Sequence, residues 1–150
     1  MVGPLIADIH LDRIDNWVKE AVAGGAKVLC GGTVHDKANN TYLPTLLTNT
    51  INSMKVCTEE AFGPVAIIES VDSFDDAVAI TNDSVFGLQA GVFTNRVDQM
   101  KKAHQELEVG GVLINNIPGF RMDSMPYGGV KDSGLGREGI KMTEPKLLVY

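Results

Sequence analysis

The sequence predicts an α/β fold with an open, mostly parallel sheet and flanking helices. Two patterns lead to this prediction. Residues 10–23 repeat apolar side chains at helical spacing, and from residue 64 onward the order is strand, helix, strand, helix, strand. Strands separated by helices in this way pair in parallel through right-handed crossovers.

The first predicted element is a helix over residues 10–23 with one apolar face. That face consists of Leu11, Ile14, Trp17, Val18, Ala21 and Val22. Gly24 and Gly25 should end the helix, because glycine adopts the left-handed conformation common at helix ends. A short strand is expected over 26–30, and the polar stretch over 33–40 is expected to be an exposed loop.

Three strands are predicted from residue 65 onward. Residues 65–68 form a nearly continuous apolar run, which is typical of a strand buried on both faces. The next strand is expected over 89–94, and a third buried strand over 112–114. The crossover rule then predicts that these strands pair in parallel.

Two helices are expected between these strands. Ser73 and Asp76 form a helix-start pattern, and Asn95 is expected to cap the second helix. The predicted apolar positions are Phe74, Ala77, Val78 and Thr81 in the first helix, and Val97, Met100, His104 and Leu107 in the second. His104 is accordingly expected to be a core or boundary residue.

The composition narrows the class of function. A chain of 150 residues is long enough for one domain, and its formal net charge of -6 argues against nucleic acid or an anionic membrane as a partner. No window approaches the roughly 20 apolar residues of a membrane span. Cys30 and Cys57 form no CxxC pair and no signal peptide is evident, so a cytoplasmic location is expected.

No metal site is expected from the histidine pattern. The three histidines, His10, His35 and His104, lack the spacing of metal ligands.

One candidate site is the segment over residues 59–65, Glu-Glu-Ala-Phe-Gly-Pro-Val. In extended backbone, Glu60 and Phe62 would point to the same side. The carboxylate could then accept hydrogen bonds from a ribose diol, with the ring covering an apolar face. The alternative, favoured by spacing alone, is a surface glutamate pair and a core phenylalanine.

A second candidate is the glycine-rich stretch over residues 126–139. Gly134, Gly136 and Gly139 match a dinucleotide-binding fingerprint by letter, but its strand, helix and later acidic residue are not expected around them. We therefore expect these glycines to permit tight turns. The segment 115–139 follows a predicted strand and is long and irregular, so it is expected to be functional.

Taken together, the two stretches resemble the aldehyde dehydrogenase superfamily. Residues 59–65 (EEAFGPV) and 126–139 (PYGGVKDSGLGREG) carry the resemblance, and residues 3–6, 26–32 and 82–88 support it. The resemblance covers essentially the whole chain in the expected order. It implies the C-terminal part of a catalytic domain over residues 1–150, without the cofactor-binding domain.

The resemblance implies which residues meet the cofactor, NAD or NADP. Glu60 matches the glutamate that holds the hydroxyls of the nicotinamide ribose. Phe62 matches the aromatic residue that packs on the same ribose, and Leu88 matches a residue near the nicotinamide.

The resemblance also implies a substrate loop over residues 116–124, which lines the aldehyde entrance. Within it Asn116, Phe120 and Arg121 are the candidate substrate-binding residues. A guanidinium at Arg121 could bind a phosphate or carboxylate on the aldehyde, and the alternative is an exposed loop arginine. Small oxygenated, often anionic aldehydes are the substrate class that the resemblance favours.

In this family a cysteine thiolate attacks the aldehyde and a glutamate activates water. Both groups are expected upstream of residue 3, so the isolated chain is predicted to be inactive and to bind little or no cofactor. Cys30 resembles a variable position. Cys57 stands beside acidic residues rather than the cationic groups that activate a thiol.

Two other hypotheses remain open: a stand-alone module for binding or oligomer formation, and one half of a split enzyme. The segment after Gly139 is shorter than the family pattern. Residues 143–150 would form a strand that joins a sheet across the subunit interface. A homo-oligomer, or association with an N-terminal portion, is therefore expected.

Overall fold

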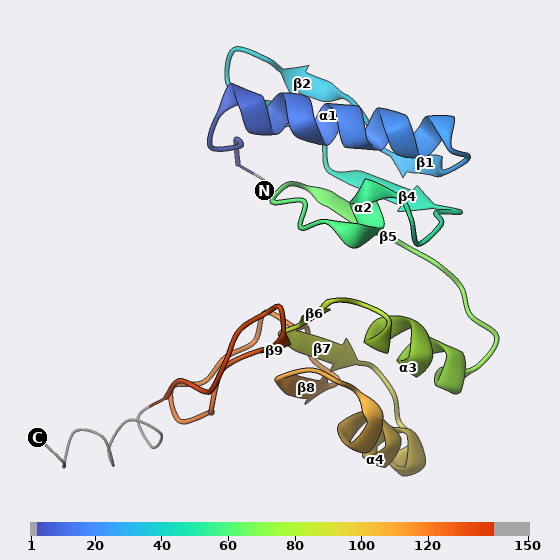
Figure 1. Cartoon of the computed structure of the whole chain (residues 1–150), viewed down its shortest axis with the longest axis vertical. Coiled ribbons are helices and arrows are strands. Elements are labelled where there is room, and N and C mark those ends of the chain that lie inside the picture. Colours follow the sequence, from blue (N-terminus) through green and yellow to red (C-terminus); the bar gives the residue numbers. More distant parts are fainter. Residues whose placement is uncertain (1–2, 140–150) are drawn as a thin grey trace, which may run out of the picture. The chain divides into compact units, whose positions relative to one another are not determined.

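The computed structural model describes residues 3–139 (Figure 1). The chain divides into two compact units, Met1–Ser70 and Val71–Tyr150, and each is described by itself. The oligomerisation strand predicted over 143–150 lies outside the described residues.

The first unit consists of a helix, a three-stranded sheet, a hairpin and a short second helix. Strand β1 pairs antiparallel with β4, and β4 pairs in parallel with β5. The elements are α1 (Asp8–Ala23), β1 (Lys27–Cys30), β2 (Val34–Asp36), β3 (Thr41–Tyr42), β4 (Thr45–Thr48), α2 (Lys55–Thr58) and β5 (Val65–Ile67). The core of the unit forms where the apolar face of α1 packs with Tyr42, Leu47 and Met54.

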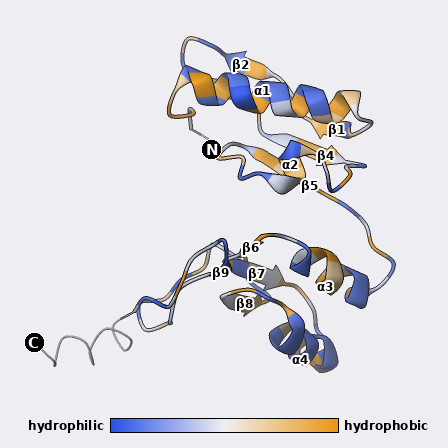
Figure 2. Ribbon diagram, viewed as in Figure 1, coloured by the Kyte–Doolittle hydropathy of each residue, from blue (hydrophilic) through white to orange (hydrophobic). Residues whose placement is uncertain are grey.

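The prediction of α1 is confirmed, and its burial agrees with four of the six predicted positions. Hydrophobic and hydrophilic residues alternate along this helix in Figure 2, as expected for a helix with one buried face. The buried positions are Leu11, Ile14, Val18 and Ala21. Trp17 is half-buried, whereas Val22 is 44% exposed because it lies beyond the edge of the packed face.

The loop predicted over 33–40 is confirmed in part: residues 37–40 form a turn, whereas residues 34–36 form strand β2, which pairs with β3 in a hairpin. Val34 pairs with Tyr42, and Asp36 pairs with Thr41. The Asp36 side chain closes the turn by accepting hydrogen bonds from the amides of Ala38 (2.9 Å) and Asn39 (3.3 Å). The polar residues that suggested a loop are therefore the residues of a tight turn.

Strand β5 is less buried than predicted. Val65 and Ile67 are half-buried, whereas Ala66 and Ile68 on the other face are exposed. The reason is topological, since β5 is an edge strand and packs against the buried cluster of the unit through Val65 and Ile67 on one face.

The second unit contains two helices and two small sheets. Strand β7 pairs in parallel with β8, with α4 as the crossover, and β6 pairs antiparallel with β9. The elements are α3 (Phe74–Asn82), β6 (Phe86–Gly87), β7 (Gln89–Val92), α4 (Val97–Glu106), β8 (Gly111–Ile114) and β9 (Val130–Lys131). Strand β8 is partly buried: Val112 and Leu113 are half-buried and Ile114 is exposed.

The α/β class is confirmed, and the pairing of the predicted strands is confirmed in part. The strands predicted over 89–94 and 112–114 form the parallel pair β7–β8. The strand predicted over 65–68 instead pairs with β4 in the first unit. Sequence order alone does not reveal such a partner, because β4 lies upstream of the alternating region.

The start of α3 is confirmed, and the start of α4 is corrected. The Ser73 hydroxyl accepts a hydrogen bond from the Asp76 amide at 3.1 Å, as a helix cap does. Helix α4 begins after Arg96 rather than Asn95, and the Arg96 amide donates to Thr94 Oγ1 at 3.1 Å.

The predicted apolar face of α4 is confirmed in part, because Met100 and Leu107 are half-buried. Ala103 is the buried residue of α4, whereas Val97 is 64% exposed and His104 is exposed. Helix α4 is mostly hydrophilic in Figure 2. It contacts α3 and β8, and its buried Ala103 lies at helical spacing from the half-buried Met100 and Leu107.

Candidate functional site

The first candidate group lies in the turn between α2 and β5. Glu60 is exposed, and the Phe62 side chain is 72% exposed. Phe62 has φ +46°, in the left-handed region, so the extended backbone predicted for this segment is wrong at Phe62. The alternative of a core phenylalanine is also wrong, because an apolar ring at this position faces solvent.

Helix α1 and strand β4 hold the backbone of this turn. The guanidinium of Arg13 donates from Nη2 to the carbonyl oxygen of Ala61 at 2.7 Å. At Gly63 a Cβ atom would lie 2.8 Å from Ile14 Cδ1, so the backbone packs closely against the Ile14 side chain of the helix there. The Thr45 amide donates to the Pro64 carbonyl at 2.8 Å. The turn is therefore fixed at its backbone while Glu60 and Phe62 are exposed.

The second candidate group lies in the second unit and begins with Leu88, between β6 and β7. Leu88 is 38% exposed. Its carbonyl accepts a hydrogen bond from Gly111 at 3.1 Å, and the Gly87 amide donates to Ser133 Oγ at 2.9 Å. The backbone at Leu88 is thus held on both sides.

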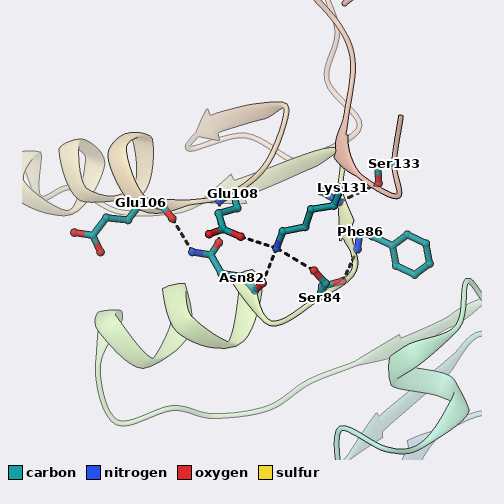
Figure 3. A network of polar contacts seen from close by, with 8 residues as sticks. Asn82, Ser84, Phe86, Glu106, Glu108, Lys131 and Ser133 are labelled. Carbon is teal, nitrogen blue, oxygen red and sulfur yellow. Dashed lines mark hydrogen bonds and ion pairs between the residues drawn. The ribbon is translucent and has the colours of Figure 1, made fainter. Parts of the chain in front are cut away.

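A polar network around Lys131 secures the same region, as Figure 3 shows. Lys131 Nζ donates to the carbonyl oxygens of Asn82 (2.6 Å) and Ser84 (3.0 Å), and forms an ion pair with Glu108 at 2.9 Å. The Asn82 side chain donates to the Glu106 carbonyl at 2.6 Å and accepts from the Glu108 amide at 2.8 Å. The network joins the ends of α3 and α4 to β9.

The predicted substrate loop follows β8. Asn116 is half-buried, and its Oδ1 atom accepts a hydrogen bond from the Ile117 amide at 2.9 Å. A Cβ atom at Gly91 would lie 2.5 Å from the Asn116 carbonyl, so β7 passes close to the start of the loop. Phe120 is 38% exposed.

Arg121 has an ordered environment rather than that of an isolated surface arginine. Its guanidinium carbon lies 4.2 Å from the centroid of the Tyr127 ring. Its Nη2 atom lies 3.9 Å from Glu138 Oε2, so the carboxylate is at the limit of an ion pair. Stacking on the Tyr127 ring orients the planar guanidinium. Because its ion-pair partner is a single exposed carboxylate, some of its N–H donors are available to bind an anion.

The glycines over 126–139 serve the turns of this unit. Gly134, Gly136 and Gly139 have φ values of +133°, +76° and +130°, which side chains with a Cβ atom rarely adopt. This geometry confirms the structural role predicted for them.

The predicted site residues therefore form two groups, one in each unit. Glu60 and Phe62 belong to the first unit, and the structure brings Arg13 to their backbone. Leu88, Asn116, Phe120 and Arg121 belong to the second. Sequence reasoning missed Arg13 and Lys131, because Arg13 bonds Ala61 and Lys131 bonds Asn82 from distant positions of the chain.

Within residues 3–139 no group of three or more His, Cys, Asp or Glu side chains is arranged to hold a metal ion. Both cysteines are free: Cys30 is exposed and Cys57 is half-buried. Among the helices of this part of the chain, none has both the length and the apolar character needed to cross a membrane.

Comparison with known families identifies the chain. The model of the aldehyde dehydrogenase family matches residues 1–146. The chain belongs to this family. The resemblance in residues 59–65 and 126–139 is thereby confirmed.

Known aldehyde dehydrogenases match this chain over part of their length. The chain is 46% identical to a 3-sulfolactaldehyde dehydrogenase from Priestia aryabhattai, over 99% of this chain and 31% of that relative. The structure of an aldehyde dehydrogenase from Physcomitrella patens, solved with the reaction product succinate, matches this chain with a TM-score of 0.89 and 39% identity. The match covers 95% of this chain and 29% of that one.

A glyceraldehyde-3-phosphate dehydrogenase from Methanocaldococcus jannaschii, solved with NADP, has a TM-score of 0.84 and 38% identity. The match covers 93% of this chain and 29% of that one. The chain thus spans about a third of the length of the relatives that it matches.

Proposed function

We propose that this chain is the C-terminal part of the catalytic domain of an NAD(P)-dependent aldehyde dehydrogenase. The observation that carries the proposal is the exposed pair Glu60 and Phe62. Phe62 is 72% exposed and has φ +46°, so an apolar ring is held in solvent by a disfavoured backbone conformation. A disfavoured conformation that exposes a hydrophobic side chain is typical of a binding site.

In this proposal Glu60 and Phe62 form one wall of the nicotinamide site. An exposed carboxylate can accept hydrogen bonds from both hydroxyls of a ribose, and an exposed ring can cover the apolar face of the sugar. Their chemistry therefore fits the cofactor that the family uses. For the second unit, Leu88 is proposed as a further cofactor-binding residue, because its side chain is an apolar surface that is 38% exposed and its backbone is held. NAD or NADP, when bound, accepts the hydride.

The proposed reaction converts an aldehyde into a carboxylic acid. A cysteine thiolate adds to the aldehyde carbon to give a thiohemiacetal, and loss of hydride leaves a thioester. A water molecule, deprotonated by a glutamate, then hydrolyses the thioester and releases the thiol and the acid. We propose that the cysteine and the glutamate belong to polypeptide other than these 150 residues, so that this chain alone is inactive.

The aldehyde that we propose carries an anionic group. Arg121 supplies a guanidinium that is stacked on Tyr127, and Asn116 and Phe120 lie in the same loop. The relatives named above are a 3-sulfolactaldehyde dehydrogenase, an enzyme solved with succinate and a glyceraldehyde-3-phosphate dehydrogenase. The aldehydes or the product in these names each carry a sulfonate, carboxylate or phosphate, which an arginine fork binds well.

The chain is proposed to act in the cytoplasm. It is also proposed to associate with further aldehyde dehydrogenase polypeptide and to form a homo-oligomer. Parallel sheets are normally covered on both faces, and β7–β8 is a parallel pair. Beside it, Phe93 is 68% exposed and Ile117 is 61% exposed. These exposed apolar residues support an assembled state.

Reconstitution tests the proposal. The chain is mixed with a polypeptide that carries the cofactor domain and the catalytic cysteine, and formation of reduced nicotinamide is followed with succinate semialdehyde as substrate. We expect activity in the mixture and none in either chain alone. Failure of the two chains to co-purify, or turnover by this chain alone, would contradict the proposal.

The substrate class is tested by replacing Arg121 in the active mixture. Arg121→Met should lower kcat/KM for succinate semialdehyde about ten- to hundredfold, and should change kcat/KM little for butyraldehyde, which lacks the carboxylate. Arg96→Met is the matched control, since Arg96 is also exposed in the second unit but pairs with Asp98. Equal losses with both aldehydes would show that Arg121 does not select an anion.

A further inference from the structure

Arg13 connects helix α1 to the turn that carries Glu60 and Phe62. Its Nη2 atom donates to the carbonyl oxygen of Ala61 at 2.7 Å, across 48 positions of sequence. Ala61 lies between the two exposed candidate residues. A single side chain from α1 thus reaches the peptide unit between Ala61 and Phe62.

The guanidinium of Arg13 is itself held in place. Its carbon atom lies 5.0 Å from the centroid of the Trp17 ring, on the next turn of α1. The residue is half-buried, and its Nε atom is buried without a hydrogen-bond partner among residues 3–139. A buried donor without a hydrogen bond costs free energy. The position of the guanidinium is therefore set by its contacts with Trp17 and Ala61 and not by hydrogen bonding of its Nε atom.

The turn needs such a contact because its backbone is strained. Phe62 adopts φ +46°, which is disfavoured for a residue with a Cβ atom, and its ring is 72% exposed and contributes little packing energy. The strain is therefore balanced by the neighbouring backbone. Arg13 fixes the carbonyl before Phe62, and the close packing of Ile14 against Gly63 fixes the residue after it.

We propose that Arg13 is a positioning residue for the nicotinamide site. It acts through the Ala61 carbonyl and holds Phe62 in its left-handed conformation, so that Glu60 and Phe62 are preorganised for the ribose. The proposal rests on the cofactor role proposed for these two residues. A general packing role in α1 would instead make Arg13 matter for stability alone.

Four variants separate these roles. Arg13→Met removes the donor and keeps an unbranched apolar side chain, whereas Arg13→Lys keeps a donor. Val18→Ala is the stability control, because Val18 is buried in the same helix but is not bonded to the turn. Lys19→Met is the charge control, because it removes a cation from α1 whose partner is Asp15.

The first measurement uses the whole 150-residue chain and needs no cofactor. Amide chemical shifts and hydrogen exchange of Ala61, Phe62 and Gly63 are recorded by NMR. Arg13→Met should shift these resonances and speed their exchange, and Arg13→Lys should restore them in part. Val18→Ala should lower the melting temperature with smaller changes in the turn. Unchanged resonances in Arg13→Met, or equal changes in Val18→Ala, would overturn the proposal.

The second measurement uses the reconstituted enzyme. Arg13→Met should raise KM for the nicotinamide cofactor about three- to tenfold, with a smaller change in kcat, since one hydrogen bond that orders the site is lost. Arg13→Lys should lie between the two, and Lys19→Met should match the wild type. If KM is unchanged while the turn is altered, Arg13 positions the backbone but not the cofactor. If the wild type shows no activity, the proposed function fails and the NMR result still decides whether Arg13 holds the turn.

Discussion

The ammonium group of Lys131 lies 2.6 Å from the carbonyl oxygen of Asn82, although the two residues are 49 positions apart. The carbonyl belongs to the last residue of α3, and the lysine belongs to β9. This contact, with those to Ser84 and Glu108, joins two separate segments of the second unit to one charged group on β9 (Figure 3). Charge-assisted hydrogen bonds of this kind are stronger than neutral ones.

We expect Lys131→Met to lower the free energy of unfolding by about 1 to 2 kcal/mol, because it removes the donor while two carbonyls and a carboxylate lose their partner. The side chain of Lys131 is 25% exposed, so water offsets part of the loss. Urea unfolding followed by circular dichroism measures the effect. Lys101→Met, at an exposed position of α4, is the control, and an equal effect there would show that the network contributes nothing specific.

A second prediction concerns Gly110, which lies just before β8. A Cβ atom at this position would collide with the carbonyl oxygen of Gly128 and would lie 2.9 Å from that of Leu88. The neighbouring atoms are backbone and have little room to move. Gly110→Ala should therefore destabilise the unit by about 1 to 3 kcal/mol or more. Thermal unfolding of the two variants measures the effect. Gly119→Ala is the control and should be nearly neutral, because the nearest atom to a Cβ at Gly119 is 3.9 Å away.

Helix α1 shows how much of the fold the sequence could predict. Its apolar positions recur at helical spacing, and Leu11, Ile14, Val18 and Ala21 are buried as expected. Spacing is a local property, so one sequence is enough to find the element and its inner face. Burial of β5 and α4 was predicted less well, because exposure depends on which distant segments cover each face.

The site was predictable only through family motifs. Glu60 and Phe62 were found because their segment resembles a known pattern, but the pattern did not contain the φ of +46° at Phe62. Neither the Arg13–Ala61 bond nor the stacking of Arg121 on Tyr127 follows from periodicity, because both depend on how the chain folds back. Backbone strain and long-range side-chain contacts are set by tertiary packing.

Tyr42 should make stability depend on pH at the alkaline end. The residue is 4% exposed, and burial, together with the negative charge of Asp15, raises the pKa of Tyr42 to about 12. An unfolded tyrosine has a pKa of about 10. Between these values the unfolded chain loses the proton while the folded chain keeps it, so deprotonation favours the unfolded state.

The stabilisation should therefore be complete below about pH 10 and lost as pH rises toward about 12, with a fall of about 1 to 3 kcal/mol. Lysines also titrate in this range, so the quantity to measure is the difference in unfolding free energy between the wild type and Tyr42→Phe. That difference should be constant at neutral pH and should decrease above about pH 10. A difference that does not vary with pH would show that the phenol titrates alike in both states.

The last prediction concerns Tyr127 and rests on the proposed role of Arg121. The Tyr127 ring supports the guanidinium at 4.2 Å, so it should order the arginine without touching the substrate itself. An exposed cation–π contact is worth about 0.5 to 1 kcal/mol, which corresponds to about a two- to fivefold change in binding. In the reconstituted enzyme, Tyr127→Leu should lower the ratio of kcat/KM for succinate semialdehyde to that for butyraldehyde by this factor. Tyr127→Phe keeps the ring and should leave the ratio unchanged. Equal losses with both aldehydes in Tyr127→Leu would mean that the ring supports the loop as a whole, and that the orientation of Arg121 does not set the preference for an anion.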